Sequence, residues 1–304
     1  MHRGFGNPVL MSRPSDGVPA PRDPVPARHA AGAPEPPDSR PEKGRVPAAA
    51  LRMDERLVSL RSPDSFEADQ YRVLRHFLQG AAGDDRLQVL AVSSPAAGEG
   101  KTTTAVNLAA TLAQSSGARV LLVDTDLRRP CVASSLGLGS SAGPGLTGAL
   151  LDERLDLGAV VRVTPFNLSV VPAGSPLGNA YQILESPRMG RLLEEARGSY
   201  DHVILDTPPL LLVPDCRLLS RWVDGFVIVV AARRTPRRLL AETLGAMDPA
   251  KLVGIVFNGD DRPLSGYYKG YYAGYYHEGA RKARGRKWLS WWRRGQPGRQ
   301  KAWR

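Results

Sequence analysis

The sequence predicts an α/β fold in which a mostly parallel, doubly wound sheet is flanked by helices on both faces. Three observations support this prediction. Short apolar runs suited to buried strands recur between residues 89 and 257, helical patterns separate these runs, and polar or glycine-containing turns follow several of them. Strands that helices cover on both faces read as continuous apolar runs, as a parallel sheet requires.

Composition separates a folded region from two extensions. Residues 1–50 contain eleven prolines among small and charged residues, so we expect this segment to be disordered. The net charge is +11, yet residues 66–276 are balanced, while residues 277–304 hold ten Lys and Arg against one acid. We therefore divide the chain into a Pro-rich segment (1–50), an α/β domain (51–262), a tyrosine-rich segment (263–280) and a basic tail with tryptophans (281–304).

A helix is predicted near the start of the domain, over residues 65–79. Ser65 can cap its first turn, and apolar residues recur behind it at helical spacing. Asp69, Arg72 and Arg75 occur at every third position and therefore lie along one face. That face is either a solvated charged surface or a contact with another subunit.

The next predicted elements are a strand at residues 89–92 and a helix that continues to Ala113. The loop between them ends in Gly-Lys-Thr at residues 100–102, although Pro95 replaces the early glycine of the usual pattern. Backbone N–H groups at a helix N-terminus, together with a lysine, bind phosphate; the alternative is a plain turn with a solvated lysine. The residues expected to bind the cofactor are Gly98, Glu99, Gly100, Lys101, Thr102 and Thr103.

Three carboxylates are predicted at the ends of two further strands. Asp124 and Asp126 follow an apolar strand at residues 119–123, and Asp206 follows another at residues 202–205. Carboxylates are costly to bury without partners. They suit a cation at the carboxyl ends of parallel strands, where ligands bind in open α/β sheets.

The remaining elements complete the alternation of strands and helices. Thr235 is expected to cap the last helix, with Pro236 in its first turn. The expected strands cover residues 168–171, 226–230 and 252–257, and the expected helices cover residues 180–197 and 236–247.

A three-fold Gly-Tyr-Tyr repeat follows the last strand and holds six of the nine tyrosines. Glycine at every fourth position weakens a helix by roughly 1 kcal/mol each, so we expect a flexible segment. The tyrosines either form an aromatic packing strip or present their hydroxyls to an enzyme site. They are Tyr267, Tyr268, Tyr271, Tyr272, Tyr275 and Tyr276.

Four features occur in a fixed order along the chain: the loop at residues 98–102, the acid pair within residues 121–130, the run at residues 203–209 that ends in Asp-Thr-Pro-Pro, and the tyrosine repeat. In this combination the chain resembles the bacterial tyrosine kinases (BY-kinases) that regulate capsule and exopolysaccharide synthesis. The resemblance covers roughly residues 60–276. It implies a P-loop NTPase fold and an autokinase that uses ATP and Mg²⁺.

The resemblance also implies roles for individual residues. Lys101 would contact the β- and γ-phosphates, and Thr102, Asp126 and Asp206 would hold Mg²⁺ or its water shell. Asp124 would orient or deprotonate the incoming tyrosine hydroxyl. The six tyrosines of the repeat would be the phosphoacceptors.

Several partners are implied in the same way. Asp69, Arg72 and Arg75 match a family motif that assembles subunits into a ring, with Asp69 in place of the family's glutamate. We expect a membrane polysaccharide co-polymerase or adaptor, and a phosphotyrosine phosphatase, as protein partners. The tail at residues 281–304 is either a solvated, disordered extension or, because it combines basic residues with tryptophans, a contact with an anionic membrane surface. Nucleic acid is not expected, because no folded basic platform accompanies the tail.

We expect the chain to be cytoplasmic and recruited to the inner face of the plasma membrane. No apolar run is long enough to cross a bilayer, and the first residues do not form a secretory signal. Cys131 and Cys216 lie far apart without metal-ligand spacing, which favours a reduced compartment and ordinary packing roles.

Two other functions share the predicted sheet. A Min/Par-type membrane-associated ATPase would carry a signature lysine five residues before Lys101, where this chain has Ala96. That difference and the tyrosine repeat favour the kinase. The other alternative is a non-catalytic, nucleotide-dependent scaffold for polysaccharide export, in which the tyrosines are adhesive contacts.

Overall fold

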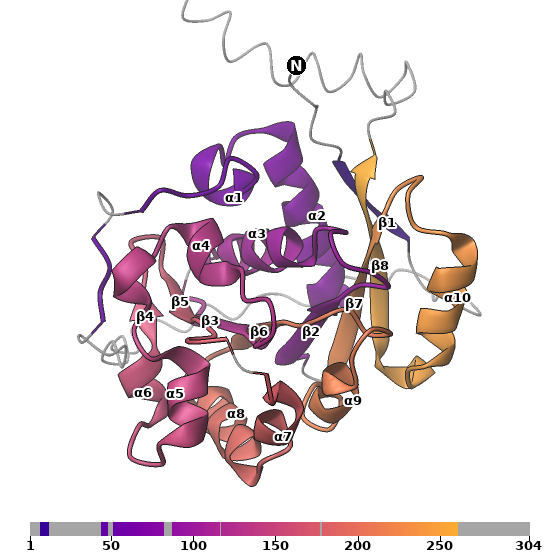
Figure 1. Cartoon of the computed structure of the whole chain (residues 1–304). Helices are drawn as coiled ribbons and strands as arrows, with labels where there is room; N and C mark the ends of the chain where they lie inside the picture. Colours follow the sequence, from indigo (N-terminus) through magenta and orange to yellow (C-terminus); the bar gives the residue numbers. More distant parts are fainter. Residues whose placement is uncertain are drawn as a thin grey trace, which may run out of the picture. The chain divides into compact units, whose positions relative to one another are not determined.

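An eight-stranded sheet organises the domain, as the computed structural model shows (Figure 1). The structure describes residues 7–11, 44–47, 51–81, 87–115, 117–176 and 178–260. The strands are β1 (Asn7–Met11), β2 (Val89–Ser93), β3 (Val120–Asp124), β4 (Arg162–Val163), β5 (Leu168–Val171), β6 (His202–Asp206), β7 (Gly225–Ala231) and β8 (Leu252–Asp260).

The strand order is β1-β8-β7-β2-β6-β3-β5-β4. The six strands from β8 to β5 are parallel, while β1 and β4 are antiparallel additions at the two edges. The predicted doubly wound, mostly parallel sheet is thus confirmed. This order places the carboxyl ends of β2, β6 and β3 side by side.

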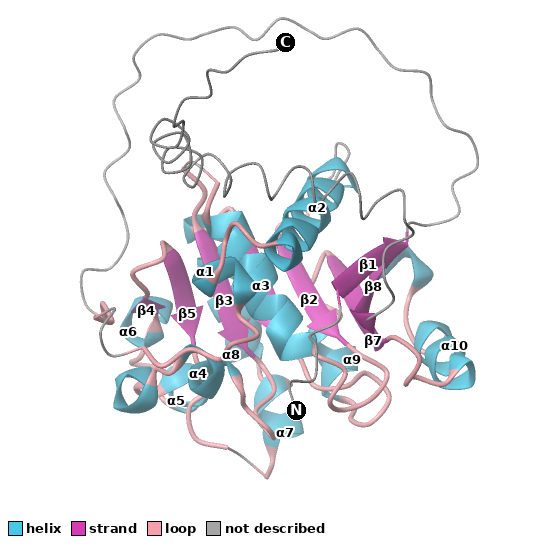
Figure 2. Ribbon diagram, turned by 90° about the horizontal axis from the view of Figure 1, so that it is seen from above, coloured by secondary structure: helices cyan, strands magenta, loops and turns pink. Residues whose placement is uncertain are grey.

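Helices cover both faces of the sheet. One face carries α1 (Val58–Arg61), α2 (Phe66–Ala81), α3 (Lys101–Ala113) and α4 (Val132–Leu136) (Figure 2). The other carries α5 (Gly145–Leu151), α6 (Leu157–Val160), α7 (Ala180–Leu184), α8 (Pro187–Ser199), α9 (Asp215–Leu219) and α10 (Arg237–Gly245). Two short 3₁₀ turns, η2 (Gly139–Ala142) and η3 (Pro249–Lys251), complete the described elements.

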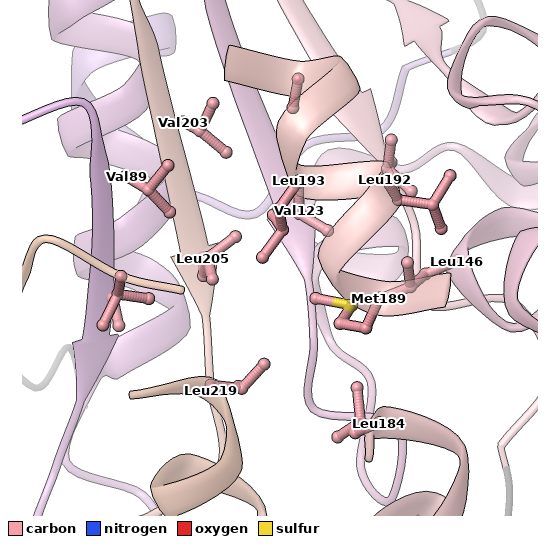
Figure 3. Close-up of a cluster of buried hydrophobic side chains, with 14 of the residues drawn as sticks. Val89, Val123, Leu146, Leu184, Met189, Leu192, Leu193, Val203, Leu205 and Leu219 are labelled. Carbon is pink, nitrogen blue, oxygen red and sulfur yellow. The ribbon is translucent and has the colours of Figure 1, made fainter. Parts of the chain in front are cut away.

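Alternate residues of each central strand enter two separate cores. Val89 of β2 and Val123 of β3 pack beneath α5 to α9, while Leu90 and Leu122 pack beneath α1 to α4. Figure 3 shows strand side chains facing Met189 and other residues of the covering helices. Continuous apolar runs in the sequence are therefore explained by burial on both sides.

Two predicted features of the helices are wrong in detail. The single helix expected over residues 180–197 is two helices, α7 and α8, because Pro187 starts a new helix at its first position. Thr235 does not cap α10; Pro236 occupies that position, and the Thr235 side chain bonds elsewhere. The cap expected of Ser65 is confirmed, since its hydroxyl accepts the N–H of Ala68 at 3.2 Å.

Short pieces of the Pro-rich segment pair with both edges of the sheet. β1 lies antiparallel to β8, and Val46 donates its N–H to Val163 of β4 at 2.9 Å. Sheet edges offer unpaired N–H and C=O groups, so a short extended segment can bind there without a core of its own. The rest of residues 1–50, for which we expected disorder, lies outside the described residues.

The packing of α8 against the sheet gives a stability prediction. Leu192 is only 2% exposed, so its truncation to alanine should leave a cavity. Leu192→Ala should therefore lower the free energy of unfolding by about 2–5 kcal/mol. Leu151→Ala is the matched control, since Leu151 is 62% exposed and its truncation should change stability by less than about 0.5 kcal/mol. Urea unfolding measures both; equal losses would contradict this packing.

Candidate active site

The loop between β2 and α3 presents the N-terminus of α3 at the carboxyl edge of the sheet. Gly100 ends the loop with φ = +93°, and α3 begins at Lys101. A Cβ atom on Gly100 would lie 1.9 Å from Asn258 Nδ2, so glycine is required both by conformation and by space. The backbone N–H groups of the first helical turn are therefore held open toward an anion.

The loop is fixed from behind by a buried carboxylate. Glu99 is only 5% exposed, and its carboxylate accepts the N–H of Ala96 at 3.1 Å and the hydroxyl of Thr235. Asn258 Nδ2 donates to the Glu99 carbonyl at 2.9 Å. Burial raises the pKa of Glu99, and the Thr235 hydrogen bond opposes that rise. We expected Glu99 among the cofactor-binding residues, but its side chain makes these contacts to Ala96 and Thr235 instead. We call Glu99 and its contacts to Ala96, Thr235 and Asn258 the Glu99 clamp.

Three carboxylates meet beside the loop. Asp124 of β3 and Asp206 of β6 lie opposite each other in the sheet, and Asp126 follows two residues after Asp124. Lys101 Nζ lies 3.2 Å from Asp126 Oδ2, and the Thr102 hydroxyl donates to Asp206 Oδ2 at 2.6 Å. The structure thus brings together the loop and all three acids that the sequence singled out.

Asp124 is satisfied by backbone groups. It has no exposed surface, and its carboxylate accepts the N–H groups of Asp126, Cys131 and Val132 at 3.0–3.2 Å. Burial raises the pKa of Asp124 well above its ordinary range, and the charge of Asp206 raises it further. The expected role of Asp124 toward a tyrosine hydroxyl stays a prediction, and it would require the carboxylate to leave these contacts.

Asp206 has one oxygen in need of a partner. It is fully buried, and its Oδ1 has no hydrogen-bond partner among the described residues. Burial raises its pKa to about 6, although nearby Lys101 opposes the rise. Burial also disfavours the charge of Lys101, but Asp206 and Asp126 together raise the pKa of that ammonium group. A buried carboxylate with an unsatisfied oxygen fits a divalent cation or its bound water.

A cation here would need ligands from outside the protein. In the part of the chain that the structure describes, no group of three His, Cys, Asp or Glu side chains could hold a metal ion alone. Mg²⁺ is usually bound by one or two carboxylates, with waters and phosphate oxygens completing its shell. Asp126, Asp206 and Thr102 match that incomplete set.

An open pocket of about 430 Å³ lies in front of the loop. Five of its residues were not expected from the sequence: they come from the segment before α1 and from the start of α4. No motif distinguishes them, and only the fold brings them to the loop. The pocket is lined by Asp54, Arg56, Gly98, Gly100, Lys101, Thr102, Thr103, Cys131, Ser134 and Ser135.

Sequence reasoning also missed an ion pair behind the acids. Arg128 Nε donates to Asp215 Oδ2 at 2.9 Å, and a second guanidinium nitrogen donates to Oδ1 at 3.2 Å. Asp215 is fully buried at the start of α9. This bidentate pair ties the loop after Asp126 to the helix that follows β6.

The residues expected at a subunit contact have partners within this chain. Asp69 and Arg72 form an ion pair one turn apart on α2. Arg75 donates to the Thr111 carbonyl at 3.0 Å and to the Ser115 hydroxyl at 3.1 Å, both on or just after α3. The ring contact stays a prediction. The six tyrosines from Tyr267 to Tyr276 lie outside the described residues.

The acid cluster predicts how stability depends on pH without metal and nucleotide. Asp206 has a pKa of about 6 in the folded protein against 3.8 ordinarily. Between these values only the unfolded chain loses the proton, so the free energy of unfolding should fall as pH rises from about 4 to 6. One pKa unit is worth about 1.4 kcal/mol.

Asp206→Asn keeps an acceptor for Thr102 and removes the charge. It should flatten this decline and be more stable than the wild type at pH 7.5, measured by urea unfolding in EDTA. Parallel pH profiles for the two proteins would show that the cluster does not carry the effect.

Comparisons with known proteins agree with this geometry. A family described as an AAA domain (AAA_31) matches residues 87–233. The tyrosine-protein kinase YwqD of Bacillus subtilis is 36% identical over 210 residues, covering 68% of this chain and 87% of that protein. The succinoglycan biosynthesis transport protein ExoP of Rhizobium meliloti is 30% identical over 220 residues, covering 69% of this chain and 27% of ExoP.

A solved structure is similar as well. The kinase domain of the Escherichia coli tyrosine kinase ETK superposes with a TM-score of 0.63 at 28% identity, covering 69% of this chain and 83% of that domain. Sequence and structure therefore lead to the same group of enzymes, and the chain belongs to the bacterial tyrosine-protein kinase family.

Proposed function

We propose that this chain is a Mg²⁺- and ATP-dependent autokinase that phosphorylates its own C-terminal tyrosine cluster, and that this regulates capsule or exopolysaccharide polymerisation and export. One observation carries the proposal: Lys101, Thr102, Asp126 and Asp206 converge at the N-terminus of α3. An ammonium group, a hydroxyl and carboxylates at a phosphate-binding helix are the parts that phosphoryl transfer needs.

Each part has a distinct task in this proposal. Backbone N–H groups of residues 98–103 hold the β- and γ-phosphates, and Lys101 neutralises their charge. Thr102, Asp126 and Asp206 hold Mg²⁺, which when bound offsets the negative charge on the phosphate oxygens. The salt bridge between Lys101 and Asp126 keeps the ammonium group charged and aimed across the site.

The transfer itself needs mainly positioning. The tyrosine oxygen forms a bond to the γ-phosphorus while the bond from that phosphorus to the bridging oxygen of ADP breaks. The phenolic proton passes to a carboxylate, and Asp124 is our candidate for that role. ADP then leaves the site, and the phosphotyrosine stays on the chain. Each added phosphate places about −1.5 to −2 charges in the segment before the basic tail.

Membership of the family supports a proposal about the wider assembly. We propose a ring of subunits through the α2 face of Asp69, Arg72 and Arg75, and a phosphotyrosine phosphatase that reverses the modification. No helix in the described ranges has both the length and the apolar character needed to cross a bilayer. ExoP, named as a transport protein and much longer than this chain, supports a membrane co-polymerase as the activating partner. That partner, with the tail at residues 281–304, would hold the chain at the inner face of the plasma membrane.

The kinase proposal predicts a specific loss. The full chain incubated with ATP and Mg²⁺ should acquire phosphotyrosine. Lys101→Met should lower that signal by at least about 100-fold, because it removes the only positive charge that residues 98–103 offer to the phosphates. Mass spectrometry should place the phosphates on Tyr267 to Tyr276.

A variant with all six of these tyrosines changed to Phe is the control, since it should bind nucleotide normally yet gain no phosphate. Undiminished phosphotyrosine in Lys101→Met would contradict the kinase site. Phosphate found only on Tyr71, Tyr181 or Tyr200 would contradict the acceptor; two of these, Tyr71 and Tyr200, are buried.

A further inference from the structure

We infer that Arg56 is a second phosphate-binding cation of the nucleotide site, and that Asp54 competes with the nucleotide for its guanidinium group. The inference rests on the proposed nucleotide site and adds a residue that the sequence motifs do not include. Both side chains line the pocket in front of the phosphate loop.

The backbone around Arg56 is fixed to the same helix that carries Lys101. Asn107, buried on α3, donates to the Arg56 carbonyl at 2.9 Å and accepts the N–H of Ser59 at 2.8 Å. On the opposite side, Asp54 donates its N–H to the Ser135 carbonyl at 2.8 Å. The segment is thus anchored to both walls of the pocket, so Arg56 is held in place rather than projecting from a loose end.

The Arg56 guanidinium group is paired with Asp54 but is accessible to a ligand. Arg56 Nε donates to Asp54 Oδ1 at 2.9 Å, and a second guanidinium nitrogen contacts Oδ2. The Arg56 side chain is nevertheless 55% exposed, and ion pairs in water are weak. A phosphate group also offers two oxygens for the two-pronged guanidinium and carries more negative charge, so it is the stronger partner for Arg56.

The charge balance of the pocket calls for such a group. Among the described residues that line it, the cations are Lys101 and Arg56. Lys101 already contacts Asp126, and the charges of Asp206 and Asp126 both act on its ammonium group. Nucleotide phosphates therefore meet one shared cation at the loop, and Arg56 supplies an unshared one once it leaves Asp54.

Asp54 predicts the direction in which a substitution changes nucleotide binding. Its carboxylate lines the pocket and would repel phosphate directly while also holding Arg56. In the wild-type chain the backbone N–H of Arg56 donates to Asp54 Oδ1 at 2.9 Å. Asp54→Asn keeps a side-chain oxygen for this N–H but removes the negative charge. If the pair only stabilised the local turn, this substitution would leave nucleotide binding unchanged or weaker. If Asp54 competes, binding becomes tighter.

The test is calorimetric titration of the full-length protein with ADP and Mg²⁺. We expect Arg56→Gln to raise the dissociation constant by about 10-fold, Arg56→Lys to recover part of that loss, and Asp54→Asn to lower the constant by about 3-fold or more. Arg52→Gln is the matched control, because Arg52 is an exposed arginine of the same segment that does not line the pocket. Its constant should equal that of the wild type.

Thermal unfolding of each unliganded variant, compared with the wild type, identifies any variant that is misfolded. An Arg56→Gln constant equal to that of Arg52→Gln would overturn the inference, and so would unchanged or weaker binding by a well-folded Asp54→Asn. If Lys101→Met loses ADP binding while Arg56→Gln retains it, the proposed site stands and only the role of Arg56 fails. If Lys101→Met binds ADP as the wild type does and keeps its phosphotyrosine, the proposed site itself fails.

Discussion

The burial of three neighbouring carboxylates, two of them beside Lys101, is the constraint on which this domain depends. Asp124, Asp126 and Asp206 are each at most 3% exposed, and the parallel pairing of β3 and β6 forces two of them together. Such burial is costly unless hydrogen bonds and counter-charges compensate it. Backbone N–H groups satisfy Asp124, and Lys101 and Thr102 satisfy part of the other two, so the remaining need is for a cation. The catalytic proposal begins from this incomplete compensation.

The surrounding structure keeps that cluster in place. The Glu99 clamp ties the phosphate loop to Thr235 beyond β7 and to Asn258 on β8, and the pair of Arg128 and Asp215 ties the acid loop to α9. These contacts join elements that are distant in sequence but adjacent at the carboxyl edge of the sheet. A disturbance at β8 would therefore reach the phosphate loop through the hydrogen bond of Asn258 to the Glu99 carbonyl.

Much of this arrangement could be predicted from the sequence, because apolar runs report burial and strand ends report where ligands bind. The parallel sheet, the loop before Lys101 and the convergence of the three acids were expected and are present, and the relatives favour the kinase over the ATPase and scaffold alternatives. Features that depend on long-range contacts could not be predicted. Thr235 reads as a helix cap but bonds to Glu99, and nothing local places Arg56 in the pocket.

The central claim is that the acid cluster needs a cation and a nucleotide together. The direct measurement is the thermal unfolding midpoint of the wild-type protein at pH 7.5 with ADP, in the presence of Mg²⁺ and in the presence of EDTA. A ligand that binds only the folded state raises the midpoint, and the rise grows as the ligand concentration exceeds its dissociation constant. Our account predicts a rise with ADP and Mg²⁺ that exceeds the sum of their separate effects. An equal rise with ADP in EDTA would contradict it.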